Sequence, residues 1–372
     1  MTAKIVSAQR TIIAPKNGAF AGVSLSDLSA PVIRACLARA GIIADQVDEV
    51  IVSNALGGGG NPARLCSLAA GIPHNVAGLS LDRQCVGGLD ALILAKAMIE
   101  AGQAQVIVAG GVESYSTRPI RLASQHPAAL AQPYDRPAFV PAPMPDPDMD
   151  WAMFQVAEKY GLQQKDMDDW AMRSHANALG ARNRLQREIV RVPGIDVTHD
   201  PYARTLSDRV CARAPQIFGP ITYANTAIAA DGAAYVVMVS TDFAKEHSLA
   251  GVDVVLGKTA GATPHEPAIA PVYAIDHVLG ALDLAPNDLT HVEMMEAYAA
   301  QAMLCTHLTQ LPLERVNRYG GALARGHPIG ASGAVLAVRL FHDIMAADGG
   351  VGLAAIAAAG GLGTAVVLQR RL

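Results

Sequence analysis

The chain has 372 residues, of which 51% are hydrophobic and 17% charged, and its net charge at pH 7 is −4. This length exceeds one ordinary hydrophobic core and predicts two or three domains or subdomains. The weak negative charge argues against a nucleic-acid partner or an anionic membrane surface. The five cysteines lack paired spacing, which favours a reducing compartment over a disulfide scaffold or a metal site. Without an evident signal peptide or membrane-spanning stretch, we expect a cytoplasmic protein.

The first hundred residues alternate between strand and helix patterns. Strands are predicted at 4–9 and 47–54, and helices at 26–40 and 61–70. Four glycines at 57–60 follow the second strand, as in a phosphate-binding loop. No phosphate-loop lysine or dinucleotide-binding glycine frame follows them, so we reject that interpretation.

A glycine-flanked turn, LDRQCVGGL at 81–89, places Cys85 directly before a predicted helix at 90–100. A strand at 105–109 follows and ends in Gly110 and Gly111. The backbone N–H groups and the dipole at a helix N-terminus favour negative charge, and a thiolate is a good nucleophile. We therefore predict that Cys85 is a covalent acyl-carrying nucleophile. The alternative is a small buried residue that fills a tight turn.

The character of the chain changes after residue 115. Residues 116–150 are proline-rich, and helical patterns follow at 153–160 and 165–189. A buried strand pattern returns at 231–239, so we interpret about 116–220 as an inserted, mostly helical lobe. Its aromatic residues Trp151, Phe154 and Trp170 are candidates for lining an acyl or aromatic pocket, with the core of the lobe as the alternative.

A second cycle of the same elements begins at Val252. A strand from there, a helix at 272–282, a strand at 291–295 and a helix at 296–308 precede the run GHPIGASG at 326–333. This run places His327 before a helix at 334–346, a strand at 352–357 and the pair Gly360-Gly361. The order matches that around Cys85, which indicates an internal duplication with Cys85 and His327 at a common seam.

A cysteine and a histidine that meet can perform acyl transfer. The imidazole either takes the thiol proton or holds a thiolate in an ion pair. The oxyanion needs donors, and backbone amides at the helix start and beside the second Gly-Gly pair, at Ala359, are available. For His327 the alternative is a structural capping histidine. Glu113 and Glu296, each at a strand end, are predicted to orient a partner or to close their turns by hydrogen bonds.

These motifs together resemble the thiolase family, the acetyl-CoA C-acyltransferases. The matching pieces are RQCVGGLDAL at 83–92, NPARLCSLAAGIP at 61–73, GGVES at 110–114, DGAAYVV at 231–237, EAYAAQ at 296–301, GGALARGHPIGASGA at 320–334 and GGLGTAVV at 360–367. The resemblance implies an α/β fold with a five-layer αβαβα core, built from two duplicated halves, 1–248 and 249–372, and the inserted loop lobe.

The resemblance also assigns roles. It implies Cys85 as the acylated nucleophile and His327 as its activating base. It implies acyl-CoA and CoA as substrates, no covalently bound cofactor, and a homodimer or homotetramer.

Two of the departures from the family pattern remove groups that carry chemistry. Ala357 stands where the family usually carries a second cysteine, which moves the proton on the α-carbon of the second acyl-CoA. Met295 stands where the family has an asparagine that holds an oxyanion-hole water. A general acid–base group is worth about 10²–10⁴ in rate and an oxyanion donor about 10²–10³, so we expect acyl loading of Cys85 to survive more readily than carbon–carbon bond formation.

Three functions follow from this reasoning. The first is a thiolase-like acyltransferase that loads Cys85 and passes the acyl group to an acceptor needing no second cysteine. The second is a conventional acetyl-CoA acetyltransferase with a substitute acid or base. The third is a non-catalytic scaffold subunit, which has no physical need for both Cys85 and His327.

Overall fold

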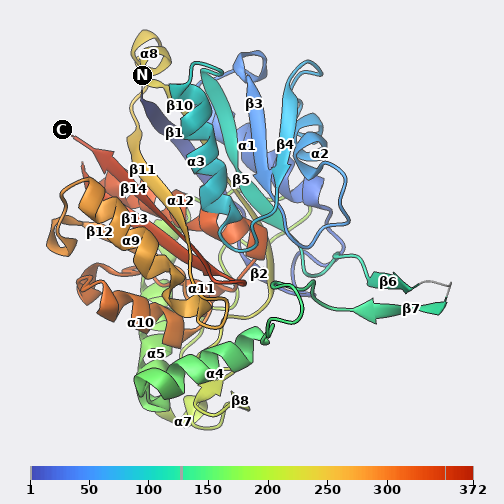
Figure 1. The fold of residues 1–372 in the computed structure, drawn as a ribbon. Coiled ribbons are helices and arrows are strands. Elements are labelled where there is room, and N and C mark those ends of the chain that lie inside the picture. The colour runs from blue at the N-terminus through green and yellow to red at the C-terminus, as the bar shows by residue number, and fades with distance from the viewer. Residues whose placement is uncertain (1, 126–128, 348, 372) are drawn as a thin grey trace.

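The fold is built on one mixed sheet of ten strands, seen in a computed structural model that describes residues 2–125, 129–347 and 349–371 (Figure 1). Nine strands follow the order β12-β13-β14-β11-β1-β10-β5-β3-β4, and the short β2 pairs with β10. The strands are β1 Ala3–Arg10, β2 Ala14–Pro15, β3 Glu49–Ser53, β4 Ala77–Leu81, β5 Val106–Glu113, β10 Ala230–Ser240, β11 Val252–Gly261, β12 His291–Met294, β13 Gly350–Ala358 and β14 Leu362–Arg370.

The pairing pattern repeats within the sheet, as the sequence predicts. In the first part β3 pairs in parallel with β5, β5 is antiparallel to β10, and β10 is antiparallel to β1. In the second part β12 pairs in parallel with β13, β13 is antiparallel to β14, and β14 is antiparallel to β11. Only two residue pairs join β1 to β11, so the two parts meet along a short seam. The first part alone has an additional edge strand, β4, in parallel with β3.

The helices form layers around the two parts of the sheet. Helices α3 and α12 contact strands of both parts and form the central layer, while α1 and α9 cover the two outer faces. The main helices are α1 Leu25–Ala40, α2 Pro62–Ala69, α3 Gly87–Glu100, α8 Thr241–Glu246, α9 Ala270–Ala281, α10 Ala299–Leu308, α11 Ala322–Arg325 and α12 Ile329–Ala346. With the strands between them, these layers give the α/β fold the αβαβα arrangement.

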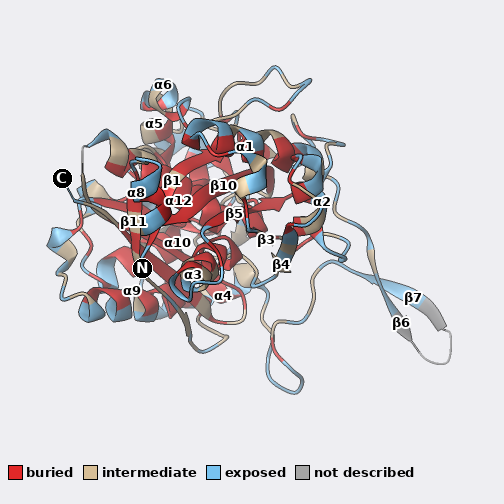
Figure 2. Ribbon diagram, turned by 90° about the horizontal axis from the view of Figure 1, so that it is seen from above, coloured by how far each residue is buried: buried red, intermediate tan, exposed pale blue. Residues whose placement is uncertain are grey.

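Burial is greatest at the centre of the molecule, where every residue of β5 and β10 and most of α12 are buried (Figure 2). Helix α12 is mostly apolar because sheet and helix cover it, and fourteen of its eighteen residues are buried. It is the one helix in the described ranges that is long and apolar enough to cross a membrane by length and composition. Since 78% of that stretch is buried inside the protein, it has the character of a core helix.

The inserted lobe is not mostly helical, contrary to the prediction. Its helices are α4 Met149–Tyr160, α5 Gln164–Gly180, α6 Arg182–Leu185 and α7 Asp208–Cys211, and the predicted helix at 165–189 is interrupted at Ala181. The strands β6 Arg121–Gln125 and β7 Ala129–Tyr134 form an antiparallel pair that projects from the molecule, and β8 Gln216–Phe218 pairs with β9 Ile221–Thr222. Much of the remainder is loop, because its many prolines lack the N–H that a helix interior needs.

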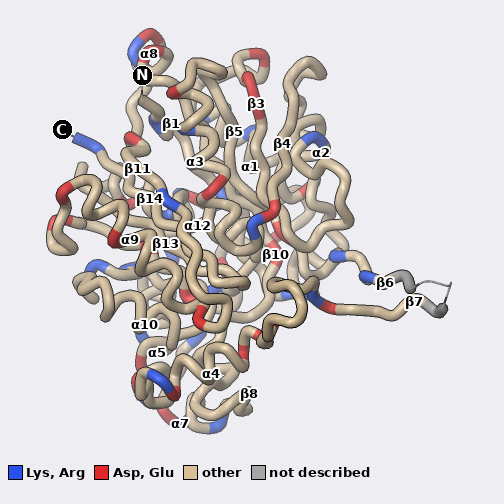
Figure 3. The backbone as a smooth tube through the Cα atoms, viewed as in Figure 1, with Lys and Arg blue, Asp and Glu red and all other residues tan. Residues whose placement is uncertain are grey.

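Charged residues are dispersed over the chain. Figure 3 shows Lys and Arg interspersed with Asp and Glu rather than gathered on one side. This distribution agrees with the small net charge.

Candidate active site

The site begins where α3 and α12 cross. A Cβ placed on Gly88 would lie 2.4 Å from the backbone nitrogen of Ala334, and one on Gly333 would lie 2.5 Å from that of Leu89. Only glycine permits this backbone contact. The crossing places the N-termini of both helices side by side, and with them the Cys85 turn (residues 82–86) and the His327 turn (residues 326–328).

The Cys85 turn is fixed by its backbone. Gln84, the residue before Cys85, has a φ of 53°, in the left-handed region. Its N–H donates to Asp82 Oδ1 at 2.8 Å, and its carbonyl accepts from the N–H of Gly87 at 3.1 Å. Helix α3 starts at Gly87, earlier than predicted, so Cys85 lies immediately outside its N-terminus.

The His327 turn is held by two distant segments. The backbone N–H of His327 donates to the Ile228 carbonyl at 2.8 Å. The N–H of Gly330 donates to Glu113 Oε2 at 3.0 Å, so the end of β5 holds the start of α12. Helix α12 starts at Ile329, five residues before the prediction, which places His327 two residues before its N-terminus.

The two turns bring Cys85 and His327 into contact. Nε2 of His327 lies 3.1 Å from Sγ of Cys85, and its Nδ1 lies 2.7 Å from Oγ of Ser332. The Ser332 hydroxyl also lies 3.0 Å from the Pro328 carbonyl, to which it donates. With that proton committed, the serine oxygen accepts from Nδ1–H, which leaves Nε2 free to accept the thiol proton. Ser332 therefore selects the tautomer in which His327 is a base toward Cys85.

Electrostatics favour a neutral pair over an ion pair. Burial raises the pKa of the Cys85 thiol to about 12, and the nearby Glu113 and Asp82 carboxylates add to this rise. Burial lowers the pKa of His327 to about 4. The resting site thus holds a thiol and a neutral imidazole, so the thiolate forms during attack rather than beforehand.

Cys85 and His327 line a cavity of about 210 Å³. Its other polar residues are Gln84, Tyr115, Thr226, Tyr298 and Gln301. The end of β13 supplies the consecutive alanines Ala357, Ala358 and Ala359. The cavity is therefore narrow, mostly apolar and closed on the β13 side by methyl groups and backbone.

Comparison with known proteins identifies the family. The thiolase N-terminal domain matches residues 3–242, and the thiolase C-terminal domain matches residues 249–370. The chain belongs to the thiolase family. The Bacillus subtilis (strain 168) protein "Putative acetyl-CoA C-acetyltransferase YhfS" is 37% identical, with 99% of both chains covered. The Staphylococcus aureus (strain MRSA252) protein "Putative acetyl-CoA C-acetyltransferase VraB" is 34% identical, again with 99% of both covered.

A solved structure agrees with this assignment. The crystal structure of the Bacillus anthracis acetyl-CoA acetyltransferase superposes with a TM-score of 0.92 at 29% identity, and covers 99% of this chain and 98% of that one. The predicted thiolase-like α/β fold is thus confirmed, and the chain is an acyltransferase of the thiolase type.

The other predicted site residues of this thiolase fall into two groups. Ala359 lies in the cavity wall beside Ala357. Glu113 and Glu296 are buried instead and accept several hydrogen bonds each. Glu113 accepts from the backbone of Ala55 and Leu56 as well as Gly330, and burial raises its pKa to about 7.

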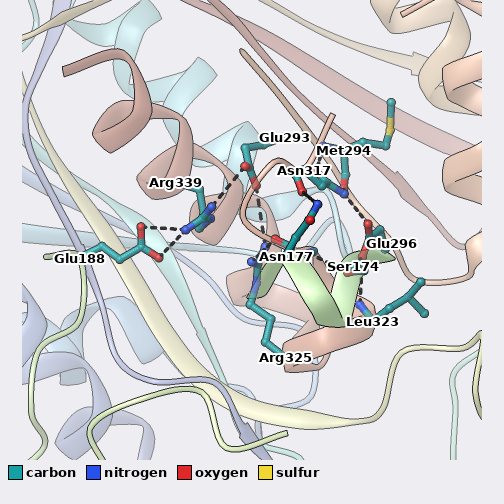
Figure 4. A network of polar contacts seen from close by, with 12 residues as sticks. Ser174, Asn177, Glu188, Glu293, Met294, Glu296, Asn317, Leu323, Arg325 and Arg339 are labelled. Carbon is teal, nitrogen blue, oxygen red and sulfur yellow. Dashed lines mark hydrogen bonds and ion pairs between the residues drawn. The ribbon is translucent and has the colours of Figure 1, made fainter. Parts of the chain in front are cut away.

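Glu296 is not among the residues that line the thiolase cavity. Its carboxylate accepts from Trp170 Nε1 at 3.1 Å. It also accepts from Ser174 Oγ at 2.7 Å, Asn317 Nδ2 at 2.7 Å and the Leu323 N–H at 3.2 Å (Figure 4). A carboxylate offers no proton to an oxyanion, so its geometry is that of a support. It ties the lobe helix α5 to α11, the helix immediately before the His327 turn.

A buried charge network, also drawn in Figure 4, anchors the lobe to α12. Arg339 of α12 lies 3.2 Å from Glu188 of the lobe and 3.6 Å from Glu293 of β12. Arg10 of β1 also pairs with Glu188 at 2.7 Å. Although burial opposes ionisation, the charges of Arg339 and Arg10 lower the pKa of Glu188 to about 2. Sequence reasoning missed this network because no local pattern marks residues that pair between distant segments of the chain.

The three aromatic residues proposed for the pocket lie elsewhere. Trp151 packs against Phe154 and Phe218, with ring centroids 5.1 and 5.4 Å away, and Trp170 is covered by Arg173. The aromatic residues that line the cavity are Tyr115, Phe139 and Tyr298. Trp170 is buried and contacts Glu296, Phe154 packs partly buried against the same core, and Trp151 is 40% exposed.

Ser332 and Tyr298 were also missed as site residues. Ser332 lies in the GHPIGASG run, one helical turn beyond the start of α12, and that spacing could have indicated it. Tyr298 lies in EAYAAQ, but its hydroxyl partner comes from the distant lobe. In the part of the chain that the structure describes, no cluster of three or more His, Cys, Asp or Glu side chains has a metal-binding arrangement.

Proposed function

We propose that this thiolase transfers an acyl group from an acyl-CoA, through a thioester on Cys85, to an acceptor that needs no second cysteine. The observation that carries the proposal is the 3.1 Å contact between Cys85 Sγ and His327 Nε2, with Ser332 on the opposite nitrogen. This is the arrangement of an activated nucleophile, a base and a group that orients the base.

The loading step follows from the neutral pair. Sγ attacks the thioester carbonyl while its proton moves to His327 Nε2. The carbon–sulfur bond of the donor breaks, and the departing CoA thiolate takes that proton from the imidazolium. The low pKa of His327 makes this imidazolium a strong acid, which favours protonation of the leaving group.

Backbone groups are available for the oxyanion. The N-terminus of α3 lies directly after Cys85, and Ala359 follows β13 in the cavity wall. Backbone amide N–H groups are present whatever the side chain. The alanines at the end of β13 can therefore still stabilise the oxyanion through their amides. We propose Cys85 and Ala359 as the residues whose amides hold the oxyanion.

The second half-reaction is where this chain differs from the family pattern. All five cysteines lie in the described ranges, and Cys85 is the only one that lines the cavity. Ala357 presents a methyl group that cannot transfer a proton. Met295 is 1% exposed within the hydrophobic core and is not a lining residue. A divergent second step is therefore part of the proposal.

A conventional acetyl-CoA C-acetyltransferase is the second candidate. The names of the two bacterial relatives favour it, since both are described as putative acetyl-CoA C-acetyltransferases and both align with this chain over nearly their whole length. It requires a group other than a cysteine to move the α-carbon proton.

Self-association belongs to the same proposal, with halves 1–248 and 249–372 in each copy. The edge strand β4 and helix α2 expose Leu65, Leu68 and Leu79 by 63, 39 and 41%. An exposed apolar surface beside an open sheet edge supports a homodimer or homotetramer. Light scattering on the purified protein tests this point.

Intact-protein mass spectrometry tests the chemistry. After mixing with acetyl-CoA, the protein should gain one acetyl group, and Cys85→Ala should gain none. Cys305→Ala is the matched control, because Cys305 is fully buried and is not a lining residue. An unaltered protein that gains no acyl group from acetyl-CoA or longer acyl-CoAs would contradict the proposal and favour a scaffold.

A further inference from the structure

A tyrosine–carboxylate pair borders the cavity that holds Cys85. Tyr298 lines this cavity at the start of α10, and its hydroxyl donates to Asp150 Oδ1 at 2.5 Å. Tyr298 is 9% exposed, and Asp150 is half-buried in the first turn of α4. A short hydrogen bond of this kind is charge-assisted: the proton stays on the tyrosine oxygen, and an ionised carboxylate accepts the hydrogen bond.

One backbone segment fixes Tyr298 relative to His327. Thr226 forms a β-bridge with Tyr298, and the N–H of Ala227 donates to the Ala297 carbonyl at 2.9 Å. Two residues further on, Ala229 forms a β-bridge with His327. Tyr298 and His327 are therefore held on the same short segment, as two groups acting on one substrate must be.

Two further polar atoms at this cavity lack a partner. Gln301 is 1% exposed, and its Oε1 has no hydrogen-bond partner among the described residues. The same is true of Oγ1 of Thr226. Both residues line the cavity beside Tyr298. Because orphaned buried polar atoms are costly, they indicate that a polar part of a substrate occupies this side of the cavity.

We propose that Tyr298, backed by Asp150, is the acid–base residue that moves the proton of a carbon acceptor in this enzyme. The inference rests on the proposed acyl-enzyme at Cys85. It assigns to these two residues a role that the methyl group of Ala357 cannot perform.

In the direction of bond formation, Tyr298 Oη takes the α-proton of the acceptor thioester while its own proton passes to Asp150. The electron pair of the broken C–H bond forms the new bond to the acyl carbonyl carbon, and the acyl–sulfur bond to Cys85 breaks. The Cys85 thiolate then regains a proton, and Asp150 releases one, which restores the starting state.

The reverse direction needs the same group. When Cys85 attacks the C3 carbonyl of acetoacetyl-CoA, the leaving group is a carbon enolate. The enolate takes a proton from Tyr298 while Asp150, which has taken up a proton beforehand, returns one to the phenolic oxygen. When Cys85 attacks acetyl-CoA, the leaving group is a thiolate, which takes its proton from His327. The same acetyl-enzyme therefore forms by two routes, of which only the first uses Tyr298.

This difference defines the experiment. The rate at which Cys85 gains an acetyl group is measured by rapid quench and intact mass, once with acetyl-CoA and once with acetoacetyl-CoA. Tyr298→Phe should load from acetyl-CoA within about threefold of the unaltered protein and lose about 10²–10⁴ in rate with acetoacetyl-CoA. Asp150→Asn should lose less, and also only with acetoacetyl-CoA. Tyr273→Phe, on the half-exposed face of α9, is the matched control.

The outcomes separate the two proposals. If the unaltered protein loads from acetyl-CoA but not from acetoacetyl-CoA, or if Tyr298→Phe slows both reactions equally, the role of Tyr298 is wrong while the acyl-enzyme stands. If the unaltered protein loads from neither, both proposals fail. Adding Ala357→Cys to Tyr298→Phe should restore loading from acetoacetyl-CoA; a double variant that stays inactive while still loading from acetyl-CoA would contradict the inference.

Discussion

The Cys85 turn and the His327 turn occupy equivalent places in the two repeats, yet they are held in different ways. Each precedes a helix of the central layer, and the two helices touch at Gly88 and Gly333. The Cys85 turn is held mainly within itself, through the left-handed Gln84 and the first turn of α3. The His327 turn is held by distant residues, including Ile228 and Glu113.

This difference follows from the chemistry of the two residues. A nucleophile needs its sulfur at one position, which a tight turn before a helix provides. A base also needs one ring orientation and one tautomer, which require partners for both ring nitrogens. The second repeat therefore carries more hydrogen bonds from distant parts of the same chain around its turn. Each substitution of one of these supporting residues should lower the catalytic rate partly rather than abolish it.

Removal of the base should have the largest effect. His327→Asn should lower the rate of acetyl loading from acetyl-CoA by about 10²–10⁴, because the thiol, whose pKa burial raises to about 12, then has no proton acceptor. The loading rate is measured in a single turnover, with acetylation monitored by intact-protein mass spectrometry. Unchanged circular dichroism serves as the folding control, and loading within threefold of the unaltered protein would show that another group is the base.

Disruption of the helix crossing should have the next largest effect. Gly333→Ala places a methyl group 2.5 Å from the backbone of Leu89, so we expect a loss of about 1–3 kcal/mol in the free energy of unfolding. Gly280→Ala is the matched control, because that helical glycine has open space around its Cβ position. It should be neutral or stabilising by up to about 1 kcal/mol. Urea denaturation of both variants measures the difference, and equal stabilities would mean that the crossing tolerates separation.

The helix crossing also shows what a sequence can predict. Glycines after Cys85 and after His327 indicated a repeat, and their spacing placed both residues before helices of the central layer. Hydrophobic periodicity and turn residues located most strands of the sheet, because both patterns are set by residues close together in the sequence. Together with the family resemblance, these signals allowed the α/β fold and the meeting of Cys85 with His327 to be predicted.

Contacts between distant segments could not be predicted in this way. Tyr298 and Asp150 are 148 positions apart, and Arg339 and Glu188 are 151 apart. Neither pair leaves a local pattern, because a buried partner is defined only by the folded chain. The sequence overpredicted helix in the lobe, also because contacts between distant segments leave no local pattern. Polar, charged stretches such as 181–189 satisfy helix propensity, but tertiary contacts at Arg10 and Arg339 determine their path.

A smaller effect should follow from loss of the orienting serine. Ser332→Ala removes the acceptor for Nδ1–H of His327, so the ring can adopt the other tautomer and rotate. One hydrogen bond is worth about 0.5–1.5 kcal/mol, which predicts a loss of about two- to tenfold in the loading rate. Ser332→Thr retains a hydroxyl and should recover part of it. A Ser332→Ala variant as slow as His327→Asn would mean that the serine does more than orient the ring.

The smallest effect should be that of pH between 8 and 9, where the loading rate should stay nearly constant because Glu113, whose pKa burial raises to about 7, is already ionised. The pKa of His327 is lowered to about 4, so its imidazole is already neutral at pH 6, and the base is lost only as pH falls toward 4. The pKa of Cys85 is raised to about 12, so its thiol does not ionise by pH 9. An ion pair could give an equally flat profile, and ultraviolet thiolate absorbance separates the two cases. The difference spectrum between the unaltered protein and Cys85→Ala should show no thiolate at pH 8. A thiolate band there would mean that Cys85 and His327 form an ion pair before substrate binds. The hydrogen bonds that hold the two turns would then stabilise this ion pair rather than the neutral thiol and imidazole.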